Sequence, residues 1–196
     1  MSAETRASDG GAGGGTGARL LAALEQRRRE LGHAPREDAL CVSLAEQRLW
    51  HYRRGALVAE YPVSTSRAAP SCVPDSLGTP LGLHEIAERI GAGAPAGMVF
   101  VGRVAQGFLW RDAPPELAPA KKNLVTTRIL WLAGLEDGVN RGTGCDTHSR
   151  YIYIHGTNQP EKIGTPNSHG CVLLRDADVI ALFDALDDRP THVLIA

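Results

Sequence analysis

The sequence predicts a mostly β fold, sandwich-like or barrel-like, with two helices, and three observations support this fold class. Eight or nine short runs have the β-branched and aromatic content or the alternation of strands, and Gly or Pro separates them. Only two stretches carry apolar residues at the i, i+3, i+4, i+7 spacing of an amphipathic helix. Strand-like and helical runs do not alternate along the chain, which argues against a parallel sheet of βαβ units.

A Gly-rich tail and one helix precede the predicted domain. The glycine content of residues 1–17 predicts a disordered tail. Residues 18–31 predict a helix, because their leucines fall on one side and a glycine follows as a stop. We therefore assign residues 18–38 to an N-terminal helix and linker, and residues 39–196 to one folded domain.

The first half of this domain is typical of antiparallel hairpins. Residues 39–44 and 49–52 predict two strands, and residues 56–64 predict a third after a tight Arg54-Gly55 turn. Pro62 places the third strand near a sheet edge, because proline has no N–H to donate to a neighbour. We expect further strands at residues 81–90, 98–103, 108–110 and 126–135, and loops at residues 66–80, 91–97, 112–122 and 136–150.

The last part of the chain places one histidine and one cysteine beside short strands. Residues 151–154 predict a strand that leads into His155, and residues 172–174 predict another that starts after Cys171. The loop between them, which contains Gly and Pro, can fold back and bring imidazole and thiol together. A nearby imidazole is one of the usual means of converting a thiol into a nucleophilic thiolate.

One helix and one strand complete the predicted domain. Asp176 is typical of a helix N-cap, and its charge suits the positive end of the helix dipole. The helical spacing that follows is carried by Val179, Leu182, Phe183 and Leu186. Residues 192–195 predict the last strand.

Composition gives no sign of a nucleic-acid partner, a transmembrane segment or a cofactor. The net charge of −1 gives no sign of a nucleic-acid partner, and the single basic run at residues 27–29 is expected to be a solvated helix face. No segment has the ~18 apolar residues of a transmembrane segment. The amino terminus lacks an apolar secretory signal, which by itself favours a cytoplasmic protein. No Gly-rich phosphate-binding motif is present, and no cofactor is predicted.

The four cysteines show no CxxC pair and no small disulfide framework. Cys41 lies in an apolar strand pattern and is predicted to be a core residue. Cys72 and Cys145 lie in predicted loops, where free thiols and a disulfide between them are both open.

The pair His155-Gly156, followed by a loop and then by residues 168–171 (Ser-His-Gly-Cys), resembles the active-site signature of the L,D-transpeptidase catalytic domain family, YkuD type. Residues 42–64 and 77–102 also resemble the opening strands of that family. The likeness covers roughly residues 39–196 and implies the fold of that catalytic domain.

The resemblance implies a role for each residue of the signature. Cys171 would be the nucleophile that forms a thioester, and His155 would remove the thiol proton and later protonate the leaving amine. The neighbouring positions are assigned to oxyanion stabilisation or positioning (Gly170, Ser168, His169) and to substrate contact (Gly156, Thr157, Arg175). One position departs from the family pattern: Leu173 stands where Arg or Asn is usual, and Arg175 lies two residues further on.

The resemblance also implies a substrate class. Family members act on peptidoglycan stem peptides or muropeptides, cleaving between diaminopimelate and a terminal D-alanine and passing the acyl group to an amine. This implies a transferase of cell-wall biogenesis and cell shape that works in the periplasm or cell wall. Carbapenem-type inhibitors would be expected to bind it.

Three alternatives compete with this interpretation. Transfer to water instead of an amine would make the protein an L,D-carboxypeptidase acting on wall fragments. A zinc site could use Cys145, His148, His155, His169 and Cys171, although no standard zinc spacing is present and no metal is predicted. A muropeptide-binding module with an inactive site is the third, and Leu173 together with the missing signal keeps it open.

Overall fold

The computed structural model describes residues 13–116 and 123–196, and this part of the chain forms ten strands and two α-helices. The strands are β1 (Asp38–Ser43), β2 (Arg48–Arg53), β3 (Ala56–Pro62), β4 (Gly82–Ile90), β5 (Met98–Val101), β6 (Val104–Leu109), β7 (Val125–Gly134), β8 (Tyr153–Gly156), β9 (Val172–Leu174) and β10 (Thr191–Ile195). The helices are α1 (Gly13–Glu30) and α2 (Asp176–Leu186). The prediction of a mostly β fold with two helices is confirmed.

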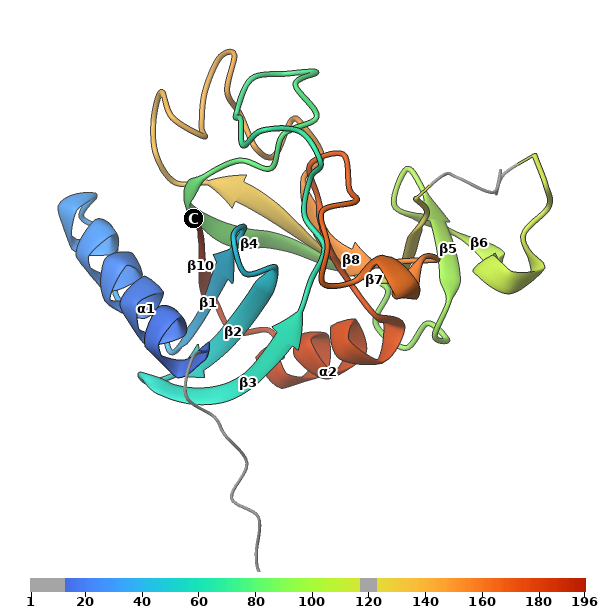
Figure 1. Cartoon of the computed structure of the whole chain (residues 1–196), viewed down its shortest axis with the longest axis horizontal. Coiled ribbons are helices and arrows are strands. Elements are labelled where there is room, and N and C mark those ends of the chain that lie inside the picture. The colour runs from blue at the N-terminus through green and yellow to red at the C-terminus, as the bar shows by residue number, and fades with distance from the viewer. Residues whose placement is uncertain (1–12, 117–122) are drawn as a thin grey trace, which may run out of the picture.

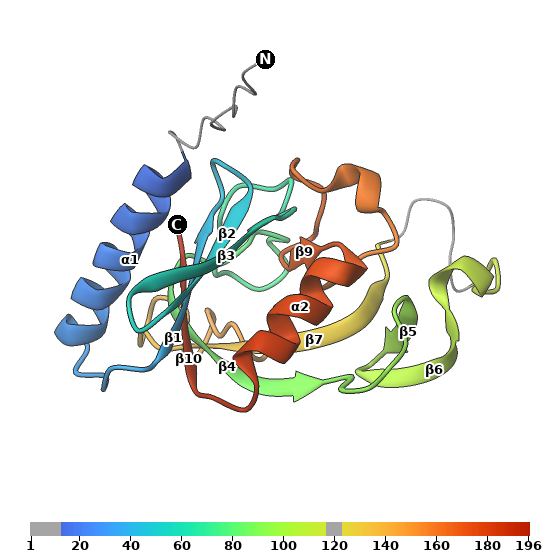
Figure 2. The same ribbon diagram turned by 90° about the horizontal axis from the view of Figure 1, so that it is seen from below.

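The ten strands form one mixed sheet. Its order is β3-β2-β1-β10-β4-β7-β5-β6, with β8 beside β7 and β9 beside β8. The β1–β10 and β8–β9 pairs are parallel, whereas neighbours such as β4 and β7 are antiparallel. The sheet curves around α2, while α1 lies at one end of the molecule and the β5–β6 hairpin at the other (Figures 1 and 2). β3 is an edge strand, as Pro62 predicts.

Two apolar cores lie on opposite faces of the central strands. In β1, Leu40 and Val42 join the core that contains α2, whereas Ala39 and Cys41 join the core under α1. This alternation explains why every residue of β1 is buried, and it confirms Cys41 as a core residue. Each fully buried aliphatic side chain of this kind contributes about 1.5–3 kcal/mol relative to an exposed one.

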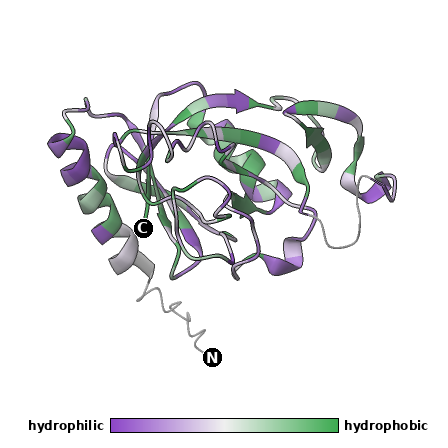
Figure 3. Cartoon of the chain, turned by 90° about the horizontal axis from the view of Figure 1, so that it is seen from above, coloured by the Kyte–Doolittle hydropathy of each residue, from purple (hydrophilic) through white to green (hydrophobic). Residues whose placement is uncertain are grey.

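Helix α1 begins at Gly13, five residues before the predicted start at Ala18 (18 − 13 = 5). Gly17 lies directly on β2: a Cβ there would sit 2.6 Å from Tyr52 Oη and 2.9 Å from the Trp50 ring. Glycine is thus what allows the helix to approach the sheet, so the expected disorder is wrong for residues 13–17. The rest of the predicted tail lies outside the described residues. Figure 3 shows hydrophobic and hydrophilic residues sharing α1, as expected for a helix packed on one side.

The basic run in α1 is not simply a solvated face. Arg27 makes an ion pair with Glu136 at 2.5 Å, and Arg28 is only 9% exposed. Glu136 also accepts a hydrogen bond from the backbone N–H of Leu83 at 2.6 Å. The loop of residues 136–150 was expected to be exposed, but its first residue is buried because it ties α1 to β4.

Other differences concern the boundaries and exposure of elements. β8 contains His155 and begins at Tyr153 rather than at residue 151. Leu57, an apolar residue of the predicted strand at residues 56–64, is 51% exposed, next to the place where the β2–β3 pairing shifts register between His51 and Tyr52. Residues 117–122 of the expected irregular segment lie outside the described residues. Neither described helix is long and apolar enough to cross a membrane.

Candidate active site

Strands β8 and β9 run side by side and set the positions of the predicted nucleophile and base. His155 of β8 pairs with Leu173 of β9 in parallel register. Ile154 and Val172 point into the core around α2, so the alternate residues face the other way. There they enclose a cavity of about 130 Å³, lined by Asn123, Val125, His155, Ser168, His169, Cys171 and Leu173. The structure therefore places His155 and Cys171 at one cavity.

His155 is buried and oriented by the backbone. Its Nδ1 lies 2.6 Å from the carbonyl oxygen of Gly156. A carbonyl can only accept a hydrogen bond, so Nδ1 carries the proton and Nε2 is left as the basic nitrogen. Burial lowers the pKa of His155 to about 4, which makes its imidazole neutral at pH 7.

Gly156, whose carbonyl orients His155, lies in close contact with Thr126 and with the carboxylate of Asp176. A Cβ on Gly156 would lie 2.7 Å from Thr126 Oγ1 and 2.8 Å from Asp176 Oδ1. Asp176 accepts hydrogen bonds from Thr126 at 2.9 Å, from Thr127, and from Trp110 Nε1 at 3.2 Å. The prediction that Asp176 caps α2 is wrong, because its carboxylate fastens β7 to α2 instead.

The N-cap position of α2 is occupied by Arg175, which makes no side-chain capping bond. Arg175 is exposed, and its nearest ionic partner is Asp178 at 3.8 Å. Thr157 is buried and accepts a hydrogen bond from the N–H of Gln159 at 3.0 Å. Like Gly156, these two predicted substrate-binding residues are absent from the lining of the 130 Å³ cavity.

Cys171 lies beside the backbone of the segment that leads into β8. The N–H of Tyr153 donates to Cys171 Sγ at 3.3 Å, and the thiol donates to the carbonyl oxygen of Tyr151 at 3.6 Å. Burial raises the pKa of the Cys171 thiol to about 11, against the opposing effects of the Tyr153 N–H and the charge of Arg150. Burial thus favours the neutral form of both the thiol and the imidazole.

The turn that precedes Cys171 is braced by Ser168. Ser168 Oγ donates to the carbonyl oxygen of Cys171 at 2.6 Å and accepts a hydrogen bond from the N–H of Gly170 at 3.2 Å. Gly170 has φ +125°, a backbone conformation that favours glycine. A Cβ there would also sit 2.9 Å from Ile152 Cδ1. His169 is exposed, and its Nε2 accepts a hydrogen bond from Arg67 at 3.0 Å.

Sequence reasoning missed Arg150, which fixes the loop opposite Cys171. Its guanidinium donates to the carbonyl oxygens of Ser71 at 2.8 Å and Gly78 at 2.9 Å. It lines a groove of about 300 Å³ whose other residues are Pro74, Asp75, Leu77, Ser149, Tyr151, Ile152 and His169. The groove and the smaller cavity, which contains Cys171, share His169. An arginine just before the predicted strand is a weak signal, because only the fold reveals its partners.

The other cysteines and histidines do not converge on this site. All four cysteines are free thiols, including Cys72 and Cys145. His148 stacks on Trp131 with ring centroids 3.9 Å apart, and it pairs with Glu88 at 3.4 Å. The described segments bring together no group of three or more His, Cys, Asp or Glu residues suited to a metal ion.

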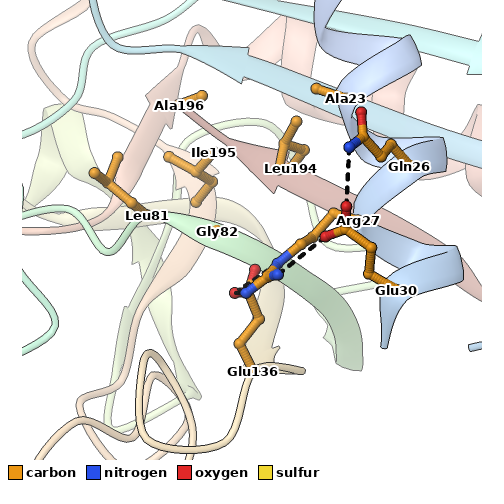
Figure 4. Close-up of a pocket in the computed structure, with 10 residues that line it drawn as sticks. All are labelled: Ala23, Gln26, Arg27, Glu30, Leu81, Gly82, Glu136, Leu194, Ile195 and Ala196. Atoms are coloured by element: carbon orange, nitrogen blue, oxygen red, sulfur yellow. Dashed lines mark hydrogen bonds and ion pairs between the residues drawn. The ribbon is translucent and has the colours of Figure 1, made fainter. Parts of the chain in front are cut away.

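A larger cavity lies elsewhere, between α1 and the end of β10. It encloses about 430 Å³ and is shown in Figure 4. Its charged wall is already paired, since Arg27 bridges Glu30 and Glu136, and its floor is apolar (Leu81, Leu194, Ile195 and Ala196). It contains neither a cysteine nor a histidine, so size alone does not mark the active site.

Comparisons with known proteins identify the family. The model of the L,D-transpeptidase catalytic domain (YkuD) matches residues 37–195. L,D-transpeptidase 3 from Mycobacterium tuberculosis is similar in fold, with a TM-score of 0.51 and 14% identity over 84% of this chain and 63% of that chain. The complex of the same enzyme with a faropenem-derived adduct has a TM-score of 0.50 and 14% identity, over 83% of this chain and 61% of that chain. An L,D-transpeptidase from Xylanimonas cellulosilytica has a TM-score of 0.49 and 18% identity, over 87% of this chain and 68% of that chain.

At these identities the structural likeness shows the fold alone. This chain spans about three fifths of the length of the mycobacterial structures it matches. No curated protein matches it. The family model, however, covers most of the chain and includes both His155 and Cys171. This chain therefore belongs to the L,D-transpeptidase catalytic domain family.

Proposed function

We propose that this protein is a cysteine-dependent acyltransferase that acts on peptidoglycan stem peptides, an L,D-transpeptidase. The observation that carries the proposal is the placement of Cys171 and His155 at one cavity, with the His155 tautomer fixed by the Gly156 carbonyl. That tautomer leaves Nε2 free to accept a proton from the thiol. Both groups rest in their neutral forms, so the proton moves as the sulfur attacks.

The reaction has two acyl-transfer steps. In the first, Cys171 Sγ attacks the carbonyl between diaminopimelate and D-alanine, and His155 takes the thiol proton. The C–N bond breaks, His155 protonates the leaving amine, and a thioester remains on Cys171. In the second step an acceptor amine attacks the thioester, loses its proton to His155, and the thiol is restored as the C–S bond breaks.

The backbone around Cys171 would stabilise the oxyanion of each step. The N–H of Gly170 already donates to Ser168 Oγ, so the N–H of Cys171 is the better candidate of the two. Ser168 also holds the Cys171 carbonyl, which fixes the direction of this peptide. Loss of one oxyanion donor costs about 2.7–4 kcal/mol of transition-state stabilisation in other enzymes.

An amine acceptor is favoured over water by a second hollow, the groove next to Arg150, which shares His169 with the cavity that Cys171 lines. The groove next to Arg150 offers about 300 Å³, whereas the cavity that holds His155 offers only about 130 Å³. A peptide that carries the acceptor amine could occupy the groove while the acyl chain stays on the sulfur. Hydrolysis by water, which is L,D-carboxypeptidation, remains the competing outcome of the same thioester.

The test is to incubate the protein with tetrapeptide muropeptides and weigh the products. We expect cross-linked dimers and free D-alanine. Tripeptides alone would identify a carboxypeptidase, and unchanged substrate would contradict the proposal. Faropenem should add its acyl mass to the wild type, by analogy with the adduct that the M. tuberculosis enzyme forms. Cys171→Ala should lose both activities and keep the same circular dichroism; retained turnover would rule out Cys171 as the nucleophile.

A further inference from the structure

Arg103, at the tip of the β5–β6 hairpin, reaches back to aromatic side chains of β7 and β8 close to the candidate active site. The hairpin projects from the end of the molecule opposite α1 (Figure 1). Arg103 has φ +69° in the turn after Gly102, a backbone conformation that is uncommon for a residue with a side chain. Strained positions of this kind are often retained where a side chain must be aimed.

The side chain of Arg103 lies over a group of aromatic rings. Its guanidinium carbon is 4.5 Å from the centre of the Trp131 ring and 5.1 Å from that of Tyr151. Its Nη1 donates to Tyr153 Oη at 3.2 Å. Aromatic faces hold a guanidinium in place without using its hydrogen-bond donors.

Tyr153 connects this arginine to the reacting groups. Its backbone N–H donates to Cys171 Sγ, and its ring centre lies 6.3 Å from that of His155. Cys171 also packs against the apolar cluster that contains Trp131 and Tyr153. Arg103 therefore sits one side chain away from the nucleophile, on the wall made by β7 and β8.

The positive charge of Arg103 has no anionic partner in the described part of the chain. No carboxylate there lies within 4.0 Å of its guanidinium, and the nearby Glu88 instead pairs with His148. Its one hydrogen-bond acceptor is a phenol oxygen, which leaves most of its five N–H donors available. A planar fork of such donors matches the geometry of a carboxylate.

We propose that Arg103 binds a carboxylate of the acyl-donor peptide and so selects acidic stem peptides at this site. The inference rests on the proposed function, because it takes the peptide as the occupant of the cavity beside Cys171. Two carboxylates of that peptide have the right chemistry. One is the terminal carboxylate of the leaving D-alanine, and the other is on the side chain of diaminopimelate.

Three peptides separate these sources: the acidic tetrapeptide, its C-terminal amide, and a version with lysine in place of diaminopimelate. Each is tested with the wild type, Arg103→Gln, Arg103→Lys and the control Arg111→Gln. Arg111 also lies over an aromatic ring, Trp110 at 4.4 Å, but it belongs to the next turn of the chain. kcat/KM for release of the terminal residue is measured for each combination.

Arg103→Gln should lower kcat/KM for the acidic tetrapeptide about tenfold to hundredfold, the range for a lost hydrogen bond to a charged group. The peptide that lacks the bound carboxylate should be equally poor with the wild type and Arg103→Gln. Arg103→Lys should recover part of the loss, and Arg111→Gln should match the wild type. Equal losses on all three peptides, or no loss on any, would overturn the proposal.

Binding separates this inference from the proposed chemistry. Dissociation constants for the same peptides are measured by calorimetry on Cys171→Ala, with and without Arg103→Gln. A preference for the acidic peptide that disappears with Arg103→Gln supports the carboxylate site even when the wild type proves to have no turnover. A dissociation constant that is the same for all three peptides, or no binding of any of them, would contradict it.

Discussion

Two buried histidines of this protein have contrasting surroundings, although both have strong hydrogen-bond partners. His51 Nε2 donates a hydrogen bond to Asp38 at 2.6 Å, and Asp38 also accepts hydrogen bonds from Arg53 at 3.0 Å and from Arg189 at 2.9 Å. Both His51 and Asp38 are completely buried. His155, by contrast, has only a backbone carbonyl at Nδ1, and it borders a cavity with a thiol.

The first centre looks more like a catalytic dyad, yet it is the structural one. Burial alone would raise the pKa of Asp38, but the hydrogen bonds from His51, Arg189 and Arg53 together lower it. Asp38 lies in β1, and its partners come from β2 and from the segment before β10, so the cluster ties the ends of the domain together. A buried carboxylate whose hydrogen bonds all come from within the protein supports the fold, whereas a histidine that borders a cavity with a thiol is placed to bind and react.

Replacing Asp38 should have the largest effect, a loss of unfolding free energy. Asp38→Ala leaves His51, Arg53 and Arg189 without their common acceptor in a buried position. Breaking such a buried ion pair costs about 3–5 kcal/mol of unfolding free energy. Urea unfolding measures this loss directly.

The same variant checks that the cluster has no part in the reaction. The rate of faropenem acylation, corrected for the folded fraction, should be the same in Asp38→Ala and the wild type. A folded Asp38→Ala protein with a hundredfold slower acylation would mean that the two histidine centres are coupled. A stability loss below about 1 kcal/mol would show that the cluster is not the clamp described above.

The buried histidines should also make the stability depend on pH, which is an effect of intermediate size. Burial lowers the pKa of His155, His84 and His192 to about 4 and also lowers that of His51. Unfolded histidines titrate near 6.5, so between about pH 6.5 and 4 the unfolded chain binds more protons. Stability is therefore full above pH 6.5 and is lost as pH falls through this window.

Each such histidine should contribute a slope of about 1.4 kcal/mol per pH unit within the window. Urea unfolding at several pH values measures the total slope. Replacing one of these histidines, as in His155→Gln, should lower the total slope by the contribution of that one histidine. An unchanged slope in His155→Gln would mean that its imidazole binds a proton as readily in the folded protein as in the unfolded chain, which would contradict the lowered pKa.

Much of the fold could be predicted from local patterns, and the failures have identifiable causes. Strands such as β1 and β10 were found because a short run of apolar and β-branched residues is a local property of the sequence. The start of α1 was missed because glycine is a poor helix former in isolation, and only its contact with Trp50 explains Gly17. The exposed Leu57 could not be predicted, since the register shift beside it depends on two strands at once.

The candidate site shows the same division. The signature residues stand out in sequence because their spacing is short and specific, and His155 and Cys171 do meet at one cavity. Asp176 was placed correctly at the start of α2 but given the wrong partner, because its contacts lie about 50 residues away in Thr126 and Thr127. Arg103 and Arg150 gave no signal, since an arginine's role depends on which surface it reaches.

The smallest expected effect concerns Leu173, the departure from the family signature. Leu173 is 1% exposed and forms an apolar wall of the cavity beside His155. Leu173→Asn restores one of the usual family residues at nearly the same size. Its amide could hold a water close to the imidazole, which an aliphatic wall does not. We therefore expect hydrolysis of the thioester to gain over transfer to an amine, by about threefold, a difference in barrier of less than ~1 kcal/mol. The ratio of tripeptide to dimer by mass spectrometry measures this, with Leu173→Met as the matched apolar control. An identical ratio in all three proteins would mean that the second hollow beside Arg150, and not the wall at Leu173, decides between the two acceptors.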